Sequence, residues 1–168
     1  MDFKEIYHLY KDLVYNLCLS YLPNTEDAED ATQEVFVKIH KQIASYQGKA
    51  ALKTWIYRIA INYCLDVLKA QKRVKRFAFI SSIFYPNSNQ IKHDLVEFKH
   101  PGTQLEQKEA LALLFGHINN LPKQQKTVLI LAKIEQLPLK EVAEIMNKTP
   151  KSVESLLGRA KQNLKKKY

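Results

Sequence analysis

The chain has 168 residues, 46% of them hydrophobic, and a formal net charge of +9 at pH 7. This length fits one medium domain or two small ones, and no run approaches the ~20 apolar residues of a membrane span. The N-terminus lacks the apolar core of a secretory signal, and neither Cys18 nor Cys64 has metal-ligand spacing. These features exclude a membrane-spanning or disulfide-framed protein. They favour a cytoplasmic protein whose basic excess attracts polyanions.

Hydrophobic periodicity predicts an all-α protein that begins with two helices. The first is expected over residues 3–22, where Pro23 ends it. Asn24 or Thr25 then caps a second helix that continues to residue 43 and begins with acidic side chains at its positive dipole end. The expected core positions are Ile6, Leu9, Leu13 and Leu17 in the first helix and Ala28, Ala31, Val35 and Ile39 in the second.

A third helix, over residues 52–76, is apolar on almost every side except one narrow face. At about 100° per residue, that face collects an aromatic ring, amide or carboxylate groups and cations. Such groups bind stacked bases and phosphates, and Tyr46 in the preceding loop offers a second ring. A solvated stripe with the Trp55 ring in the core explains the same pattern. The face comprises Trp55, Arg58, Asn62, Asp66, Lys69 and Arg73, and Lys72 belongs to the basic cluster at its end.

The second helix carries an acidic cluster with two interpretations. One is a docking face, with Asp30, Gln33 and Glu34 turned outward against a basic or polar partner helix. The other is an ordinary solvated surface, which is what most charge clusters are. The residues alone favour the solvated surface slightly.

Helical periodicity fails over residues 77–103, where Pro86, Pro101 and Gly102 mark an irregular linker. We therefore expect two small helical domains, residues 1–76 and 104–168. The second domain ends in a short helix, a three-residue turn and a longer helix capped by Thr149 with Pro150 at its first position. This arrangement predicts a helix-turn-helix that enters the major groove, although a helical hairpin without DNA is an alternative. The groove-facing candidates are Lys151, Ser152, Glu154, Ser155 and Arg159.

Nothing in the sequence points to catalysis. The five histidines lack the spacing of a metal site or a catalytic triad, and no glycine loop is built for phosphate. We expect no enzyme activity, no metal and no cofactor.

Three segments resemble, in the same order, one known family: the bacterial RNA polymerase sigma factors of the extracytoplasmic-function (ECF) group. The segment DAEDATQEVF, residues 27–36, resembles the family's polymerase-binding helix. The segment TWIYRIA, residues 54–60, together with Asn62, resembles its promoter-melting helix. Residues 121–160 resemble its domain that reads the −35 element. Glu154 and Leu156 depart from the pattern, because many members carry basic residues there.

The resemblance implies a role for each segment. Asp30, Gln33 and Glu34 match positions that bind the coiled coil of the polymerase β′ subunit. The loop over residues 46–53 matches the one that captures a flipped base of the −10 element. Core RNA polymerase and promoter DNA are thus the expected partners, and an anti-sigma factor is a further partner that the family admits. Asn62 and Asp66 match positions near the base pocket. The positions along the strand backbone are matched by Lys69, Lys72 and Arg73. The positions that contact the −35 element are matched by Lys151, Ser155 and Arg159.

The expected function is therefore a promoter-specificity subunit that docks on polymerase, reads the −35 duplex and traps an unpaired −10 base. The residues alone leave two alternatives. One is a helix-turn-helix regulator that binds duplex DNA by itself and never joins polymerase. The other is an RNA-binding adaptor.

Overall fold

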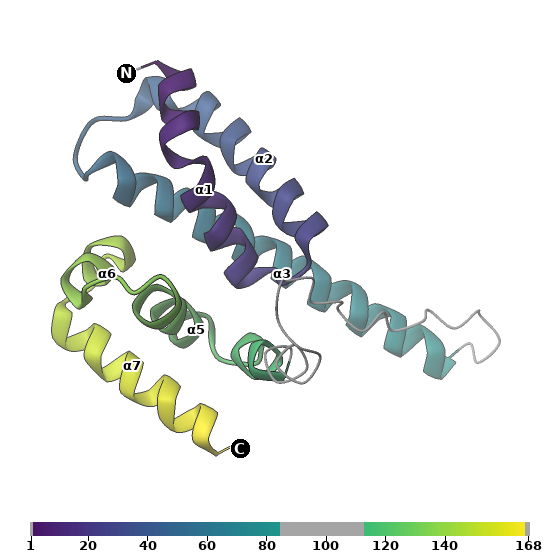
Figure 1. Cartoon of the computed structure of the whole chain (residues 1–168). Coiled ribbons are helices and arrows are strands. Elements are labelled where there is room, and N and C mark those ends of the chain that lie inside the picture. Colours follow the sequence, from purple (N-terminus) through teal and green to yellow (C-terminus); the bar gives the residue numbers. More distant parts are fainter. Residues whose placement is uncertain (1, 85–112, 167–168) are drawn as a thin grey trace, which may run out of the picture.

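The computed structural model describes residues 2–84 and 113–166, with the side chains of residues 77–84 excepted. Every regular element in these ranges is helical, as the sequence predicts, and the helices form two groups (Figure 1). The N-terminal group consists of α1 (Phe3–Tyr21), α2 (Thr25–Gln42), the short 3-10 turn η1 (Ile43–Ser45) and α3 (Leu52–Phe84). The C-terminal group consists of a helical segment over residues 113–119, α5 (Lys123–Leu129), the π-helical η2 (Ile130–Ile134), α6 (Leu139–Met146) and α7 (Pro150–Lys165).

Local capping decides where the helices begin. The Asn24 side chain accepts hydrogen bonds from the N–H groups of Glu26, at 2.8 Å, and Asp27, at 3.2 Å, so Asn24 is the cap of α2. The Thr149 hydroxyl accepts from the Ser152 N–H at 3.3 Å and Pro150 opens α7, which confirms the expected cap.

The end of α3 differs from the expectation. The sequence predicts irregular chain from residue 77, but the helix continues to Phe84. The physical reason is that no glycine or proline interrupts the chain between Leu52 and Phe84. The rest of the expected linker and the start of the C-terminal domain, residues 85–112, lie outside the described residues.

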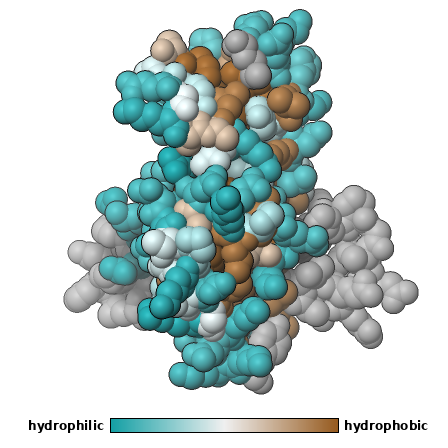
Figure 2. Space-filling model, turned by 90° about the vertical axis from the view of Figure 1, so that its left-hand side faces the viewer, coloured by the Kyte–Doolittle hydropathy of each residue, from teal (hydrophilic) through white to brown (hydrophobic). Residues whose placement is uncertain are grey.

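The two helical groups pack against each other. The C-terminal group lies beside α1 and α3, through contacts that η2 makes with α1 and α6 makes with α3 (Figure 1). The Tyr21 phenol donates a buried hydrogen bond to Thr127 Oγ1 at 3.1 Å, and the Ser20 hydroxyl donates to Glu135 Oε1 at 3.2 Å. Figure 2 shows hydrophilic side chains over most of one face and apolar ones gathered along its middle. The sequence offers no sign of this packing.

The N-terminal core forms where α1, α2 and α3 meet. Ile6, Leu17, Val35 and Ile39 are fully buried, as expected. Leu9 is the exception: its side chain is 64% exposed, because the buried stripe of α1 runs through Ile6, Leu17 and Tyr21 and leaves Leu9 to one side.

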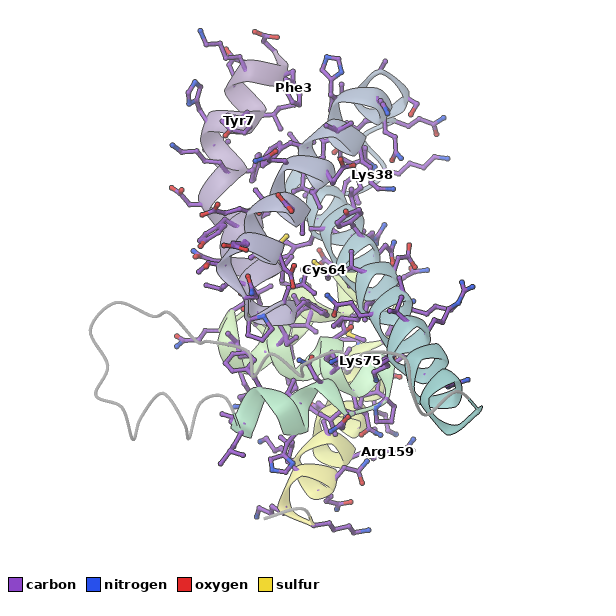
Figure 3. The ribbon with its side chains drawn as sticks, turned by 90° about the vertical axis from the view of Figure 1, so that its right-hand side faces the viewer. Phe3, Tyr7, Lys38, Cys64, Lys75 and Arg159 are labelled. Carbon is purple, nitrogen blue, oxygen red and sulfur yellow. The ribbon has the colours of Figure 1, made fainter. Side chains whose placement is uncertain are left out.

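Two cysteines meet inside the same core. Cys64 of α3 lies within the bundle (Figure 3), with its Sγ 3.7 Å from Cys18 Sγ on α1. Both are buried free thiols. The hydrogen bond to Cys18 raises the pKa of Cys64, and burial raises it further. The pair therefore packs as apolar core.

Candidate functional site

The polar stripe expected on the third helix lies along α3. Its opposite side is buried in the core through Ile56, Ala60 and Cys64, while Trp55 and Arg58 are half-buried. The helix thus presents amide, carboxylate and basic groups in one line, the set that binds bases and phosphates. The exposed members of the stripe are Asn62, Asp66, Lys69 and Arg73, and Lys72 is exposed beside them.

The loop before α3 is held by its own side chains. The Tyr46 phenol donates a hydrogen bond to the Ala50 carbonyl oxygen, across the loop. Its ring lies 5.1 Å from the Trp55 ring, centroid to centroid, tilted by 44°. Gly48 occupies the left-handed region at φ +69°, which lets the loop turn without steric strain. Trp55 therefore supports this loop rather than extending into solvent.

Arg58 has partners that its sequence position does not predict. Its Nε donates to the Ile145 carbonyl oxygen at 3.1 Å, and Nη2 donates to that of Glu144 at 2.6 Å. These carbonyls belong to the last turn of α6, where a helix carries partial negative charge. The guanidinium therefore caps α6 from α3.

A cleft of about 400 Å³ lies between α3 and the C-terminal helices. Arg58 and Asn62 line it from α3, and Lys123, Asn147 and Lys148 line it from the other side. Basic and amide side chains thus face each other across the cleft.

The basic end of α3 also reaches the C-terminal group. Lys72 Nζ donates to the Asn119 carbonyl oxygen at 3.3 Å, and the buried Lys126 Nζ donates to Asn119 Oδ1 at 3.0 Å. Burial, and then the nearby charge of Lys72, lower the pKa of Lys126 from 10.5 to about 8. Two cations therefore share one asparagine at this point.

The acidic surface of α2 is solvent-exposed. Asp30, Gln33 and Glu34 are all exposed, while Ala31 and Val35 anchor the helix in the core. The arrangement leaves two carboxylates and an amide side by side on a rigid helix.

The C-terminal helices form the expected helix-turn-helix. Asn147 ends α6 in the left-handed conformation at φ 53°, and the Lys148 N–H donates back to the Ala143 carbonyl oxygen at 2.9 Å. Val153, Leu157 and Ala160 bury one side of α7. The other side carries the expected groove-facing residues, of which Lys151, Glu154, Ser155 and Arg159 are exposed and Ser152 is half-buried.

None of the helices in the described residues is long and apolar enough to cross a membrane. Within the same ranges, no group of three or more histidine, cysteine or acidic side chains is placed to hold a metal ion.

Two family matches cover most of the chain, in order. Residues 6–74 match Sigma-70 region 2, and residues 117–164 match Sigma-70, region 4. Region 2 thus spans most of α1 to α3, and region 4 contains the helix-turn-helix. The fold and its surfaces define a sigma-70-type protein of two regions.

Similar proteins identify the group of sigma factors to which the chain belongs. The ECF RNA polymerase sigma-E factor of Haemophilus influenzae is 32% identical over 158 residues, which cover 94% of this chain and 82% of the relative. The ECF RNA polymerase sigma factor SigM of Bacillus subtilis is 31% identical over 170 residues, which cover 100% of this chain and 96% of that relative. The chain therefore belongs to the ECF RNA polymerase sigma factors. As a member of this family it directs promoter recognition by RNA polymerase and is not an enzyme.

Two solved structures share the fold. CnrH, in complex with the cytosolic domain of CnrY, has a TM-score of 0.64 at 18% identity. The match covers 97% of this chain and 84% of the CnrH chain. The sigma factor RpoE of Bartonella quintana, in complex with the anti-sigma factor NepR, has a TM-score of 0.64 at 19% identity. The match covers 98% of this chain and 95% of the RpoE chain.

Family membership decides between the three functions that the residues left open. The promoter-specificity subunit is confirmed, and the independent regulator and the RNA adaptor are set aside.

Proposed function

We propose that the exposed surface of α2 formed by Asp30, Gln33 and Glu34 binds the coiled coil of the polymerase β′ subunit. Its exposure on a helix anchored in the core supports this assignment, because the backbone of a preformed helix needs no further ordering on binding. Both carboxylates suit a basic partner helix.

The second proposed surface reads the −10 element as a single strand. The loop held by Tyr46 and Trp55 receives a flipped base, and Asn62 and Asp66 hydrogen-bond its edges. Stacking and hydrogen bonds of ~1–3 kcal/mol per base are of the right size to offset duplex melting of ~1.4 kcal/mol per step. The cations of this surface hold the strand backbone: Arg58, Lys69, Lys72 and Arg73.

The third proposed surface is the exposed side of α7, which enters the major groove of the −35 element. Lys151, Ser155 and Arg159 lie within the first three turns of the helix, where recognition helices contact bases and phosphates. Glu154 lies among them and accepts hydrogen bonds from cytosine amino groups, so the base preference differs from that of a fully basic helix. Ser152 completes this surface.

We further propose that residues 1–76 and 104–168 are the two functional domains, joined by residues 77–103. The protein works in the cytoplasm, where transcription takes place. The two solved relatives are complexes with CnrY and with the anti-sigma factor NepR, which supports an anti-sigma factor as a partner of this chain as well.

The single observation that carries this proposal is that α2, α3 and α7 each carry exposed polar or charged side chains, in the order of the family's three segments. The test is transcription from a genomic promoter library with core polymerase, with and without the protein. Specific transcripts are expected only when the protein is present. Identical transcripts in both reactions would contradict the proposal.

A further inference from the structure

The cleft between α3 and the C-terminal helices is lined by positive charge without a carboxylate. α3 runs beside α6 (Figure 1), and the cleft has a volume of about 400 Å³. Amide side chains accompany the cations, and no acidic residue of the described chain belongs to the lining. The cleft therefore concentrates positive potential in one place. The cations are Arg58, Lys123 and Lys148, and the amides are Asn62, Gln124 and Asn147.

The cations of the cleft lack anionic partners among the described residues. The salt bridge in this part of the chain joins Lys53 to Glu141, so neither Lys123 nor Lys148 is paired with a described carboxylate. Arg58 binds carbonyl oxygens through Nε and Nη2, but these oxygens carry only partial charge, and Nη1 takes no part in the two bonds. Like charges held close together without a counter-ion repel one another. A bound anion would relieve this repulsion.

The apolar part of the lining comes from both helical groups. Ile61 of α3 and Ile145 of α6 are almost completely buried, and Leu65 and Met146 are half-buried beside them. A small-molecule site typically combines apolar walls with a few polar groups in a volume of ~300–1,000 Å³. Apolar walls suit a flat heteroaromatic ring, and amide side chains supply both donors and acceptors for the edge of such a ring.

The turn that carries Asn147 and Lys148 is fixed before any ligand binds. Asn147 ends α6 in the left-handed conformation at φ 53°, and its N–H donates to the Glu144 carbonyl oxygen at 3.2 Å. The Lys148 N–H donates to the Ala143 carbonyl oxygen at 2.9 Å. Lys123 is likewise held in helical backbone, at the start of α5. The backbone that carries these cations needs no ordering on binding, which favours affinity.

We propose that the cleft binds a nucleotide that carries a di- or triphosphate chain. Arg58, Lys123 and Lys148 bind the phosphate oxygens, and the heterocycle packs against Ile61 and Ile145. A single nucleotide matches the cleft better than a nucleic-acid strand does, because the cations gather around one hollow and do not follow a continuous groove. The site goes beyond the proposed function, since Lys123 and Lys148 belong to none of its three surfaces.

The test is isothermal titration calorimetry of the full chain with ATP, GTP and inorganic pyrophosphate as probes. At least one nucleotide is expected to bind saturably and more tightly than pyrophosphate, because only a nucleotide also fills the apolar part of the cleft. Lys123→Gln with Lys148→Gln is expected to weaken this binding at least about tenfold, since it removes two charged phosphate ligands. The matched control, Lys140→Gln with Lys161→Gln, removes the same charge at exposed positions outside the lining and should bind like the wild type.

Three calorimetric outcomes overturn the proposal. The first is the absence of saturable binding of either nucleotide. The second is an equal loss in the cleft variant and the control, which would mean attraction to the net charge alone. The third is pyrophosphate binding as tight as nucleotide binding, which would mean that the heterocycle contributes nothing. If the cleft variant melts at a lower temperature without ligand, Lys123→Gln alone is compared with Lys140→Gln in its place.

Nuclear magnetic resonance locates the ligand independently of its affinity. The tighter-binding nucleotide is expected to shift the side-chain amide signals of Asn62 and Asn147, which line the cleft from its two sides. Gln71 and Asn163 lie outside the lining and should keep their signals. Shifts that spare both Asn62 and Asn147 overturn the proposal.

A short single-stranded DNA is the last probe, because a strand also presents phosphates. If the cleft variant binds this strand more weakly while neither nucleotide binds the wild type, the cleft serves the strand and the nucleotide site is overturned. Strand binding that is unchanged in the cleft variant, together with lost nucleotide binding, supports a separate site.

Discussion

Arg58 and Ile145 lie 87 positions apart in the chain, yet Nε of one donates to the carbonyl oxygen of the other at 3.1 Å. The Arg58 side chain of α3 thus caps α6, the first helix of the helix-turn-helix. The two helical groups of this sigma factor are joined through a side chain of the surface that we propose for the −10 strand.

The acidic surface of α2 provides the first prediction. The triple variant Asp30→Ala, Gln33→Ala and Glu34→Ala is expected to bind core polymerase at least about tenfold more weakly, because truncated hot-spot side chains commonly cost more than ~1.4 kcal/mol together. Equilibrium binding to core polymerase measures this, and circular dichroism checks the fold. Asp12→Ala, an exposed carboxylate on α1, is the control. Wild-type affinity in the triple variant would contradict the assignment.

Asn62 is predicted to act in strand capture. Asn62→Ala is expected to slow opening of a duplex promoter by about tenfold while affecting a pre-melted promoter less, since one lost base contact costs ~1–3 kcal/mol. Permanganate reactivity of unpaired thymines reports the opening. Gln71→Ala, an exposed amide on the same helix, is the control. An equal loss on both templates argues against base trapping.

Substitutions of Tyr46 distinguish a role in holding the loop from a role in stacking on a base. Tyr46→Phe keeps the ring against Trp55 but removes the hydrogen bond to Ala50. Faster amide hydrogen exchange is expected over residues 47–51, together with reduced promoter opening, because the loop loses its cross-link. Tyr46→Ala should be worse in both assays. Wild-type exchange and opening in Tyr46→Phe would show that the ring alone matters.

The N-cap of α7 is predicted to contribute to stability. Thr149→Ala removes the acceptor for the Ser152 N–H, which is expected to lower the free energy of unfolding by about 1 kcal/mol. Chemical denaturation measures the loss. Thr149→Ser keeps the oxygen and should stay close to the wild type, so a similar loss in both variants would show that the hydroxyl is not the cause.

Lys126 makes stability depend on pH. Folding lowers its pKa from 10.5 to about 8, through burial first and the charge of Lys72 second. Between these two values the unfolded chain binds more protons at this position, so its contribution to the free energy of unfolding rises with pH. Lys126→Met is expected to stabilise the chain at pH 7 by up to about 3.5 kcal/mol, given ~1.4 kcal/mol per pKa unit over the lowering from 10.5 to about 8.

The advantage of Lys126→Met over the wild type should therefore shrink between pH 8 and pH 10. Urea denaturation at several pH values measures the difference between the two chains, which cancels the contributions of other groups. Lys133→Met, at an exposed position, is the control. A constant difference across this range would contradict the assignment of the titration to Lys126.

Local sequence signals were enough to predict the helices and the cap of α7, because periodicity and capping depend on residues three or four positions apart. They left Asn24 and Thr25 as alternative caps of α2, and the structure identifies Asn24. The sequence also indicated the family through three short segments. Of the site residues that it named, those on α2 are exposed, whereas Trp55, Arg58 and Ser152 are half-buried. The continuation of α3 to Phe84 was missed because apolar residues without helical periodicity can still continue a helix where no glycine or proline interrupts them.

What these surfaces face is apparent only from the packing of the two helical groups. The bonds of Tyr21 to Thr127 and of Arg58 to Ile145 join residues more than 80 positions apart. They arise from the way two helical bodies pack, and that packing depends on the combined shape of many side chains rather than on any local pattern. The physical reason is that helix formation is a local balance of backbone hydrogen bonds and caps, whereas domain packing sums weak contacts over a surface.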